Sequence, residues 1–363
     1  MSGRWLTMLL AAMPLFGGTA AAPAVPTTTR AVILEKSGTG YRWKTVEREI
    51  PAPGPRQVLI HVRAVSLNRG DLEMLEPAPD ADLSGLVVAS DAAGEVVSTG
   101  PGVKDFSPGM RVSTLYFRNW VDGPMSGETL KGAHGASTDG VLAEYLVVDD
   151  TAIAPAPERL TDEEVSALPT AGLTAWTAVT AGGPVGAGDI VVVQGTGGVS
   201  TFALQFAAAS GAGVIVTSSS DEKLARARAL GAKEGINYQT TPAWSKRVLE
   251  LTGGHGADVI VDVGGKNTLK LSAQCIAYGG TLSVVGGLSG YDGEIPASDL
   301  IMKRARAQGI YVGSREDYLE MSRFIEAHRL KPVIERVFPF ERYEDALQLM
   351  ESGNFMGKIV LRF

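Results

Sequence analysis

The sequence predicts an α/β protein of two domains, a partly open β-barrel and a doubly wound parallel sheet. Its 363 residues give room for two domains of ordinary size. The first part of the chain consists of short strand-like runs bounded by Gly, Pro and Asn, whereas strands alternate with helices from about Leu160 onward. Such alternation favours right-handed βαβ crossovers and therefore a parallel sheet.

The net charge and the cysteine count exclude several classes of partner and site. A net charge of −7 argues against a nucleic-acid partner, because there is no surplus of basic residues to neutralise phosphates. The single cysteine, Cys275, excludes an internal disulfide and every zinc site that needs two or more thiolates. Cys275 lies in an apolar helical run, 268–277, and we interpret it as a small core residue rather than a nucleophile.

The first 29 residues are typical of a secretory signal peptide followed by a Pro/Thr-rich tether. Arg4 precedes an apolar run over 5–16, and Ala22-Pro23-Ala24 has the pattern of a cleavage site. The run is too short for a membrane-spanning helix, so we expect no stable membrane span once the leader is removed. The protein would then be exported or periplasmic. An unused upstream start codon is one alternative, which would leave it cytoplasmic, and an organelle leader is the other.

The β-barrel domain is expected over residues 30–158. Its runs are apolar or alternate in polarity, as half-buried strands do. The predicted strands are 31–34, 58–64, 94–98, 111–116 and 142–148.

The second domain is expected over residues 159–310, beginning with a helix at 163–180. Its predicted strands are 189–194, 213–217, 235–237, 258–263 and 281–285, with 309–312 as a sixth. The helices between them are predicted at 199–210, 220–230, 243–251 and 268–277. Residues 311–363 again mix isolated helices (318–327, 343–351) with strand-like segments (333–340, 358–361), so we expect this tail to return to the first domain.

A glycine-rich turn joins the first strand of this second domain to its helix. In the motif Gly195-Thr196-Gly197-Gly198-Val199-Ser200, Gly195 permits a tight turn and Gly197 lets the backbone approach a pyrophosphate. The helix that begins after Gly198 offers N–H groups and a positive dipole end to that anion. Ser200 stands where a third glycine is usual. The βαβ context favours a dinucleotide site of the Rossmann type over a turn that needs glycine for its shape alone.

The end of the second strand indicates which dinucleotide binds. An NAD site usually places Asp or Glu there, hydrogen-bonded to the ribose hydroxyls. Here the chain reads Thr217-Ser218-Ser219-Ser220-Asp221-Glu222-Lys223, with no acid at the strand's tip. Hydroxyls at a helix N-terminus, with Lys223 and Arg226 in its first turns, suit a 2′-phosphate, and we predict NADPH. The alternative is that Ser219 and Glu222 form a capping box and Lys223 is merely solvated.

Several ordered motifs resemble one known family. VRAVSLNRGDL (62–72) and GEVVSTGPGVKDFSPGMRV (94–112) resemble the GroES-like domain of medium-chain dehydrogenase/reductases. LPTAGLTAW (168–176), VVVQGTGGVSTFALQFA (191–207) and the terminal GKIVL are similar to the quinone-oxidoreductase and zinc-independent alcohol-dehydrogenase-like branch. The resemblance extends over nearly everything from residue 30 to 363.

The residues depart from the zinc-dependent members of this family. Those relatives place a cysteine where this chain has Asn68, and Gly-His-Glu where it reads Ala89-Ser90-Asp91. The four-cysteine structural lobe has no counterpart, and the four histidines show no ligand spacing. We therefore expect no metal.

The resemblance also implies roles for individual residues. It implies that Lys223 and Tyr238 hold the 2′-phosphate and that Thr174 lies near the nicotinamide. It further implies that the turns Val263-Gly264 and 286–288 (Gly286 and Leu288) border the cofactor, at the carboxyl ends of their strands. The alternatives are structural: Tyr238 covers a helix and Thr174 caps one.

The expected reaction is hydride transfer from NADPH to a small activated carbonyl, enone or quinone, without a metal. Positioning and preorganised hydrogen bonds would supply the rate enhancement. Asn68 is the candidate for a polar contact to substrate or nicotinamide, and Asp71 is either a second catalytic residue or a group that orients the local backbone. Trp120, in the loop-rich stretch after Tyr116, is either a pocket wall or simple packing.

Two other functions fit the same residues. One is a metal-free alcohol/aldehyde dehydrogenase, and the other is a non-catalytic NADPH-binding redox sensor. The resemblance implies a homodimer, with the segment 266–290 near the sheet edge where relatives pair.

Overall fold

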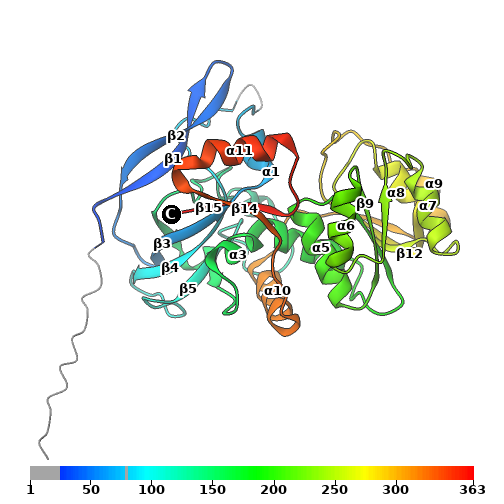
Figure 1. Cartoon of the computed structure of the whole chain (residues 1–363). Helices are drawn as coiled ribbons and strands as arrows, with labels where there is room; N and C mark the ends of the chain where they lie inside the picture. Colours follow the sequence, from blue (N-terminus) through cyan, green and yellow to red (C-terminus); the bar gives the residue numbers. More distant parts are fainter. Residues whose placement is uncertain (1–24, 78–80) are drawn as a thin grey trace, which may run out of the picture.

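The computed structural model describes residues 25–77 and 81–363, which form two lobes (Figure 1). The predicted signal peptide lies outside the described residues, apart from the end of its tether. The first strand begins at Thr28, slightly before the predicted start of the fold at Arg30. Within the described residues, no helix combines the length and the apolar character needed to cross a bilayer.

The first lobe contains a β-hairpin and a seven-stranded sheet. The hairpin pairs β1 with β2, and the larger sheet has the order β14-β15-β3-β4-β5-β7, with β6 also paired to β3. Two strands of this sheet, β14 (Ile334–Pro339) and β15 (Lys358–Arg362), come from the end of the chain. Only Tyr41 and Trp43 are fully buried in β2, so its alternation is hard to see among charged residues, and this strand is not among those predicted. The strands from the first part of the chain are β1 (Thr28–Ser37), β2 (Gly40–Glu49), β3 (Gln57–Ser66), β4 (Asp91–Thr99), β5 (Arg111–Thr114), β6 (Tyr145–Asp149) and β7 (Ile153–Pro155).

The second lobe is a six-stranded parallel sheet with the order β10-β9-β8-β11-β12-β13. The chain runs outward from β8 to β10, then returns to β11 and runs outward on the other side. The prediction of a doubly wound sheet is therefore confirmed, with its switch point between β8 and β11. The strands are β8 (Ile190–Gln194), β9 (Gly213–Ser218), β10 (Glu234–Asn237), β11 (Ala257–Asp262), β12 (Ile276–Val284) and β13 (Arg306–Gly309).

Helices cover this sheet and join the two lobes (Figure 1). Those of the second lobe are α5 (Gly198–Ala209), α6 (Asp221–Ala229), α7 (Trp244–Leu251), α8 (Leu269–Cys275) and α9 (Ala297–Lys303). The remaining helices are α1 (Arg69–Glu73), α2 (Gly127–Leu130), α3 (Asp162–Ser166), α4 (Leu173–Thr180), α10 (Arg315–His328) and α11 (Tyr343–Ser352), with 3₁₀ turns at η1 (Asp150–Ala152) and η3 (Phe340–Arg342). Cys275 is fully buried at the end of α8, and burial raises the pKa of its thiol to about 12, so this group is no nucleophile in the folded protein.

The structure corrects two predicted elements. The helix expected at 163–180 is broken into α3 and α4 by a π-helical turn, η2 (Leu168–Gly172). Pro169 lies in this turn and cannot donate a helical hydrogen bond, which gives a physical reason for the irregularity. The sixth strand lies at Arg306–Gly309 rather than 309–312.

The end of the chain returns to the first lobe. β14 (Ile334–Pro339) and β15 (Lys358–Arg362) extend the seven-stranded sheet, and β15 pairs antiparallel with β3. Gly357 bridges back to Gly197 at the start of α5, with its N–H donating to Thr196 O at 2.9 Å. This contact brings the first residue of β15 beside the glycine-rich turn.

Candidate functional site

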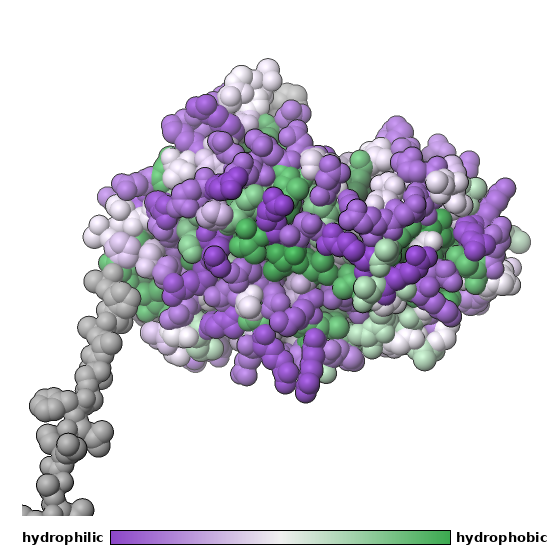
Figure 2. Space-filling view, viewed as in Figure 1, coloured by the Kyte–Doolittle hydropathy of each residue, from purple (hydrophilic) through white to green (hydrophobic). Residues whose placement is uncertain are grey.

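A cleft of about 510 Å³ opens between the two lobes, and Figure 2 shows a notch between them on the face drawn. Its wall includes the loops that follow β8, β9, β11 and β12, where open parallel sheets bind ligands. Most of the predicted site residues line it: Asn68, Gly195, Gly197, Gly198, Val199, Ser218, Ser219, Lys223, Tyr238, Val263, Gly286 and Leu288.

The glycine-rich turn leaves open space where a cofactor backbone contact is expected. Gly195 has a φ of 73°, a conformation that L side chains rarely adopt. A Cβ placed on Gly197 would meet no atom within 4 Å, so this position faces the open cleft. Ser200, at the third-glycine position, is buried and its Oγ donates to Gln194 O at 2.7 Å. Its hydroxyl therefore ties the start of α5 to the end of β8 by a hydrogen bond.

The end of β9 presents hydroxyls and one lysine to the cleft. Lys223 Nζ donates to Gly353 O at 2.9 Å. The cap of α6 is Ser220, whose Oγ accepts from Lys223 N at 3.3 Å, so the alternative capping box from Ser219 does not form. Asp221 accepts from Asn237 Nδ2 at 2.9 Å, and no carboxylate from this segment lines the cleft.

Some predicted residues lie outside the cleft wall. Thr174 is buried in α4, and Gly264 N donates at 3.0 Å to the carboxylate of Asp262. Arg226 forms an ion pair with Glu335 at 2.9 Å and is likewise absent from the wall.

Asp262, at the end of β11, is a buried residue that the sequence analysis missed. Its side chain accepts hydrogen bonds from Gln194 Nε2 at 2.9 Å, Ser272 Oγ at 2.6 Å and Thr268 Oγ1 at 2.6 Å. The carboxylate therefore ties β8 and α8 to the turn that borders the cleft. An acid at the end of an otherwise apolar strand was the signal that could have identified it.

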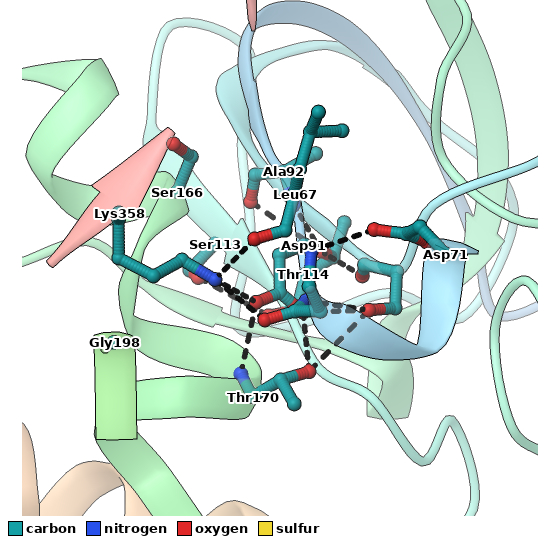
Figure 3. Close-up of polar contacts among 12 residues, drawn as sticks. Leu67, Asp71, Asp91, Ala92, Ser113, Thr114, Ser166, Thr170, Gly198 and Lys358 are labelled. Carbon is teal, nitrogen blue, oxygen red and sulfur yellow. Dashed lines mark hydrogen bonds and ion pairs between the residues drawn. The ribbon is translucent and has the colours of Figure 1, made fainter. Parts of the chain in front are cut away.

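A buried lysine lies at the junction of the lobes (Figure 3). Lys358 is 3% exposed; its Nζ donates to Leu67 O at 2.7 Å and to Asn68 Oδ1 at 2.5 Å, and lies 4.0 Å from Asp91 Oδ2. Asp91 is completely buried. The sequence analysis did not select this lysine, although a cation at the start of the apolar strand 358–361 was a signal for it.

Short polar side chains complete the network around Asp91. Ser90 Oγ donates to Asp91 Oδ1 at 2.8 Å, and Thr170 donates to the same carboxylate through Oγ1 at 2.5 Å and through its backbone N at 3.1 Å. Asn68 Nδ2 in turn donates to Ser90 Oγ at 3.3 Å. Thr170 lies in the π-helical turn, so the broken helix contributes directly to this network.

Burial shifts the pKa values of two charged groups here. Asp71 caps the start of α1 by accepting from Asn68 N at 2.7 Å, and burial raises its pKa to about 7. Burial lowers the pKa of Lys358, while Asp91 and Asp71 oppose that shift. Asp71 is absent from the cleft wall, which fits the interpretation that it orients the local backbone.

The aromatic stretch expected near the cleft packs beside it. Tyr116 Oη lies 3.3 Å from Tyr311 Oη, and burial raises the pKa of Tyr116. Trp120 stacks edge-on against Phe117, with ring centroids 5.8 Å apart. Neither Tyr116 nor Trp120 is in the cleft wall, whereas Tyr291, which the sequence analysis missed, is.

The described residues contain no group of three or more His, Cys, Asp or Glu side chains that could hold a metal ion. At the positions where zinc-dependent relatives carry cysteine and histidine, Asn68 and Ser90 are hydrogen-bonded to each other. The Lys358 ammonium contacts the same asparagine.

Both halves of the chain match family models. Residues 54–158 match the alcohol dehydrogenase GroES-like domain, and residues 198–327 match a model described as zinc-binding dehydrogenase. A zinc-type alcohol dehydrogenase-like protein from Schizosaccharomyces pombe is 38% identical to this chain, over 88% of this chain and 94% of its own length.

Solved structures share the fold. A candidate alcohol dehydrogenase from Sinorhizobium meliloti is 40% identical, with a TM-score of 0.88 over 94% of this chain and all of its own. An NAD-dependent alcohol dehydrogenase is 34% identical, with a TM-score of 0.81 over 92% of this chain and 99% of its own. A 2-octenoyl-CoA carboxylase reductase, solved with NADP and 2-octenoyl-CoA, is 27% identical, with a TM-score of 0.80 over 93% of this chain and 88% of its own.

Proposed function

Because this chain belongs to the medium-chain dehydrogenase/reductase family of oxidoreductases, we propose that it uses NADPH to deliver a hydride, without a metal, to a small activated carbonyl, enone or quinone. The observation that carries the choice of cofactor is the end of β9. Ser218, Ser219, Lys223 and Tyr238 line the cleft there, and no carboxylate accompanies them. That set suits a 2′-phosphate, which an acid would repel.

The protein's own groups bind and orient the reactants. When bound, NADPH supplies the hydride. The turn at 195–198 gives a pyrophosphate backbone N–H groups and the positive end of α5, and the open space at Gly197 lets it approach. Asn68 presents its amide in the cleft wall, where an N–H can donate to a substrate oxygen that gains negative charge.

The residues beside Asn68 do not fit a catalytic zinc. Zinc sites in proteins take thiolate, imidazole or carboxylate ligands. Here Asn68 and Ser90 already hydrogen-bond each other, the Asp71 carboxyl accepts from Asn68 N, and the Lys358 ammonium lies 4.0 Å from Asp91, the carboxylate that Ser90 contacts. A divalent cation would have to share this site with a buried positive charge, which Coulomb repulsion opposes.

Relatives support more than one substrate class. The 2-octenoyl-CoA carboxylase reductase acts on a conjugated thioester, which favours reduction of activated double bonds. The similarity to an NAD-dependent alcohol dehydrogenase favours the second candidate, a metal-free alcohol/aldehyde dehydrogenase. The third candidate is a redox sensor that binds NADPH without turnover.

A cofactor titration is the first test. We expect NADPH to bind more tightly than NADH, and Lys223→Ala to weaken NADPH binding about tenfold or more, because a charge-assisted contact contributes roughly 1.5–3 kcal/mol. NADH binding should change little. Equal affinities for the two cofactors in the wild type would overturn the choice of NADPH. The matched control is Lys131→Ala, which removes an exposed lysine paired with Glu128.

Turnover with and without metal tests the reaction. Methyl vinyl ketone, para-benzoquinone and benzaldehyde are suitable enone, quinone and aldehyde probes. We expect NADPH oxidation with at least one of the first two, unchanged after dialysis against a strong chelator and without stoichiometric zinc by elemental analysis. Loss of activity on chelation, restored by zinc, would refute the metal-free reaction. Cofactor binding without turnover of any probe would favour the sensor.

A further inference from the structure

The buried Lys358 ammonium determines how the Asn68 side chain is oriented. Lysine has three N–H donors and no acceptor, whereas an asparagine amide has one acceptor end and one donor end. Because Lys358 Nζ lies 2.5 Å from the Asn68 side chain, the amide must turn its oxygen toward the ammonium. The NH₂ group then faces the other way.

The other end of the amide has a matching partner. Asn68 Nδ2 donates one hydrogen to Ser90 Oγ at 3.3 Å, and Ser90 Oγ can accept it because its own hydrogen goes to Asp91 Oδ1 at 2.8 Å. Asp91 lies 4.0 Å from Lys358 Nζ, which closes the ring (Figure 3). In the described part of the chain, the second Nδ2 hydrogen has no hydrogen-bond partner, and Asn68 lines the cleft.

The position of Lys358 is fixed by packing. Its side chain lies against Gly198, where an added Cβ would come within 2.6 Å of Lys358 Cδ (Figure 3). The backbone hydrogen bond from Gly357 N to Thr196 O holds the start of β15 beside the glycine-rich turn. The Lys358 side chain therefore passes beside the glycine-rich turn. Its Nζ donates hydrogen bonds to Leu67 O and to Asn68 Oδ1.

We propose that Lys358 is a positioning residue that holds the Asn68 amide with its oxygen inward, so that its free N–H donates to the substrate oxygen on which negative charge develops. This inference rests on the proposed function. The Lys358 ammonium thus acts indirectly: it orients the Asn68 amide, and the amide donates the hydrogen bond to the reacting carbonyl.

Kinetics of four variants test the proposal. Lys358→Met should lower kcat with methyl vinyl ketone about tenfold to a hundredfold, less than the cost of removing an oriented donor outright, because the Asn68 amide stays but loses its fixed orientation. The Kd for NADPH should change less than about threefold, because the hydrogen bonds of Lys358 go to Leu67 and Asn68. In an Asn68→Ala background, Lys358→Met should add less than about threefold, because the lysine acts through the asparagine. Lys44→Met, which removes an exposed lysine paired with Glu35, is the control.

Folding is controlled separately, because Lys358→Met leaves Asp91 buried without its cation. The variant Lys358→Met/Asp91→Asn, compared with Asp91→Asn alone, should show the same fall in kcat. Three results would each overturn the proposal. The first is an unchanged kcat in Lys358→Met, and the second is a fall in its NADPH affinity in place of a fall in kcat. The third is an equal effect of Lys358→Met on kcat in the presence and in the absence of Asn68.

A second readout does not depend on activity. In a nitrogen–proton correlation spectrum, the Asn68 side-chain amide is identified by its loss in Asn68→Asp. Wild type should show two sharp proton signals, one shifted by its hydrogen bond to Ser90 and one open to the cleft, and Lys358→Met should shift or broaden both. If no probe substrate turns over, the proposed function fails while this spectrum still decides whether Lys358 orients Asn68. An unchanged amide signal in Lys358→Met would overturn the inference.

Discussion

Single residues in this protein take their chemistry from burial. Asp71 is a first-turn acid of α1, a place where acids are usually favourable and ionised. Here burial outweighs both the hydrogen bond from Asn68 and the nearby Lys358 ammonium, and the pKa rises to about 7. The same burial lowers the pKa of Lys358. Both groups therefore resist ionisation more than their exposed counterparts.

The Asp71 carboxyl predicts a pH-dependent stability. Its folded-state pKa of about 7 lies above the value of about 4 in an unfolded chain, so the unfolded state releases its proton first as the pH rises. Stability from this group is full below about pH 4 and is lost as the pH rises to about 7. Asp71→Asn cannot ionise, so relative to wild type it should gain up to about 3 kcal/mol in unfolding free energy between pH 5 and pH 8. Urea unfolding at both pH values measures this, and parallel pH profiles for the two proteins would contradict it.

At the scale of elements, two irregular turns build the site. The turn after β8 needs the positive φ of Gly195, and the π-helical turn around Pro169 presents Thr170 N to Asp91. A regular helix over 163–180 would have used that N–H internally. The glycine-rich turn lies beside β15, whose first residue is Lys358, and the π-helical turn reaches the same network through Asp91.

In the glycine-rich turn, we expect Gly197 to matter for NADPH binding and not for folding. Gly197→Ala should leave the melting temperature nearly unchanged, because the added methyl meets no atom within 4 Å and φ is −72°. The methyl projects into the space expected for the pyrophosphate, so NADPH affinity should fall at least about tenfold, or about 1.4 kcal/mol. Gly186→Ala, whose Cβ would also find space but lies outside the cleft, is the matched control. Full NADPH affinity in Gly197→Ala would place the cofactor elsewhere.

At the scale of the molecule, the six-stranded sheet ends in an exposed strand. All four residues of β13 are exposed, and among the described strands β13 pairs only with β12. The adjacent helix α9 exposes Ile301 and Met302 at 72% and 76%. An exposed edge with neighbouring apolar side chains favours association with a second copy.

We therefore expect a homodimer formed along β13. Ile301→Asp/Met302→Asp should raise the dimer dissociation constant at least about tenfold, because charges would be buried at the interface. Analytical ultracentrifugation across a dilution series measures it. Leu130→Asp, an exposed leucine on α2 in the other lobe, should have no effect. A wild-type protein that sediments as a monomer at all concentrations would contradict the dimer.

Most of the alternating strands and helices of the second domain, its parallel sheet and the glycine-rich turn could be predicted from the sequence alone, whereas β2, β7 and the short helices α1, α2 and α9 were not predicted. These features depend on local patterns: a period of two or of 3.6 residues, and glycine at a sharp turn after an apolar strand. The resemblance of motifs along the chain then indicated the medium-chain dehydrogenase/reductase family. The absence of an acid at the end of β9 predicted NADPH as the cofactor.

Only the tertiary structure joined Lys358, Asn68, Asp91 and Thr170 into one network. Lys358 and Asn68 are separated by 290 positions in the chain, and no local pattern links them. Whether a lysine is solvated or buried against a carboxylate depends on which strand packs beside it, and the return of β15 to β3 determines that. Burial then controls the pKa values of Asp71 and Lys358, since loss of water costs the charged form most.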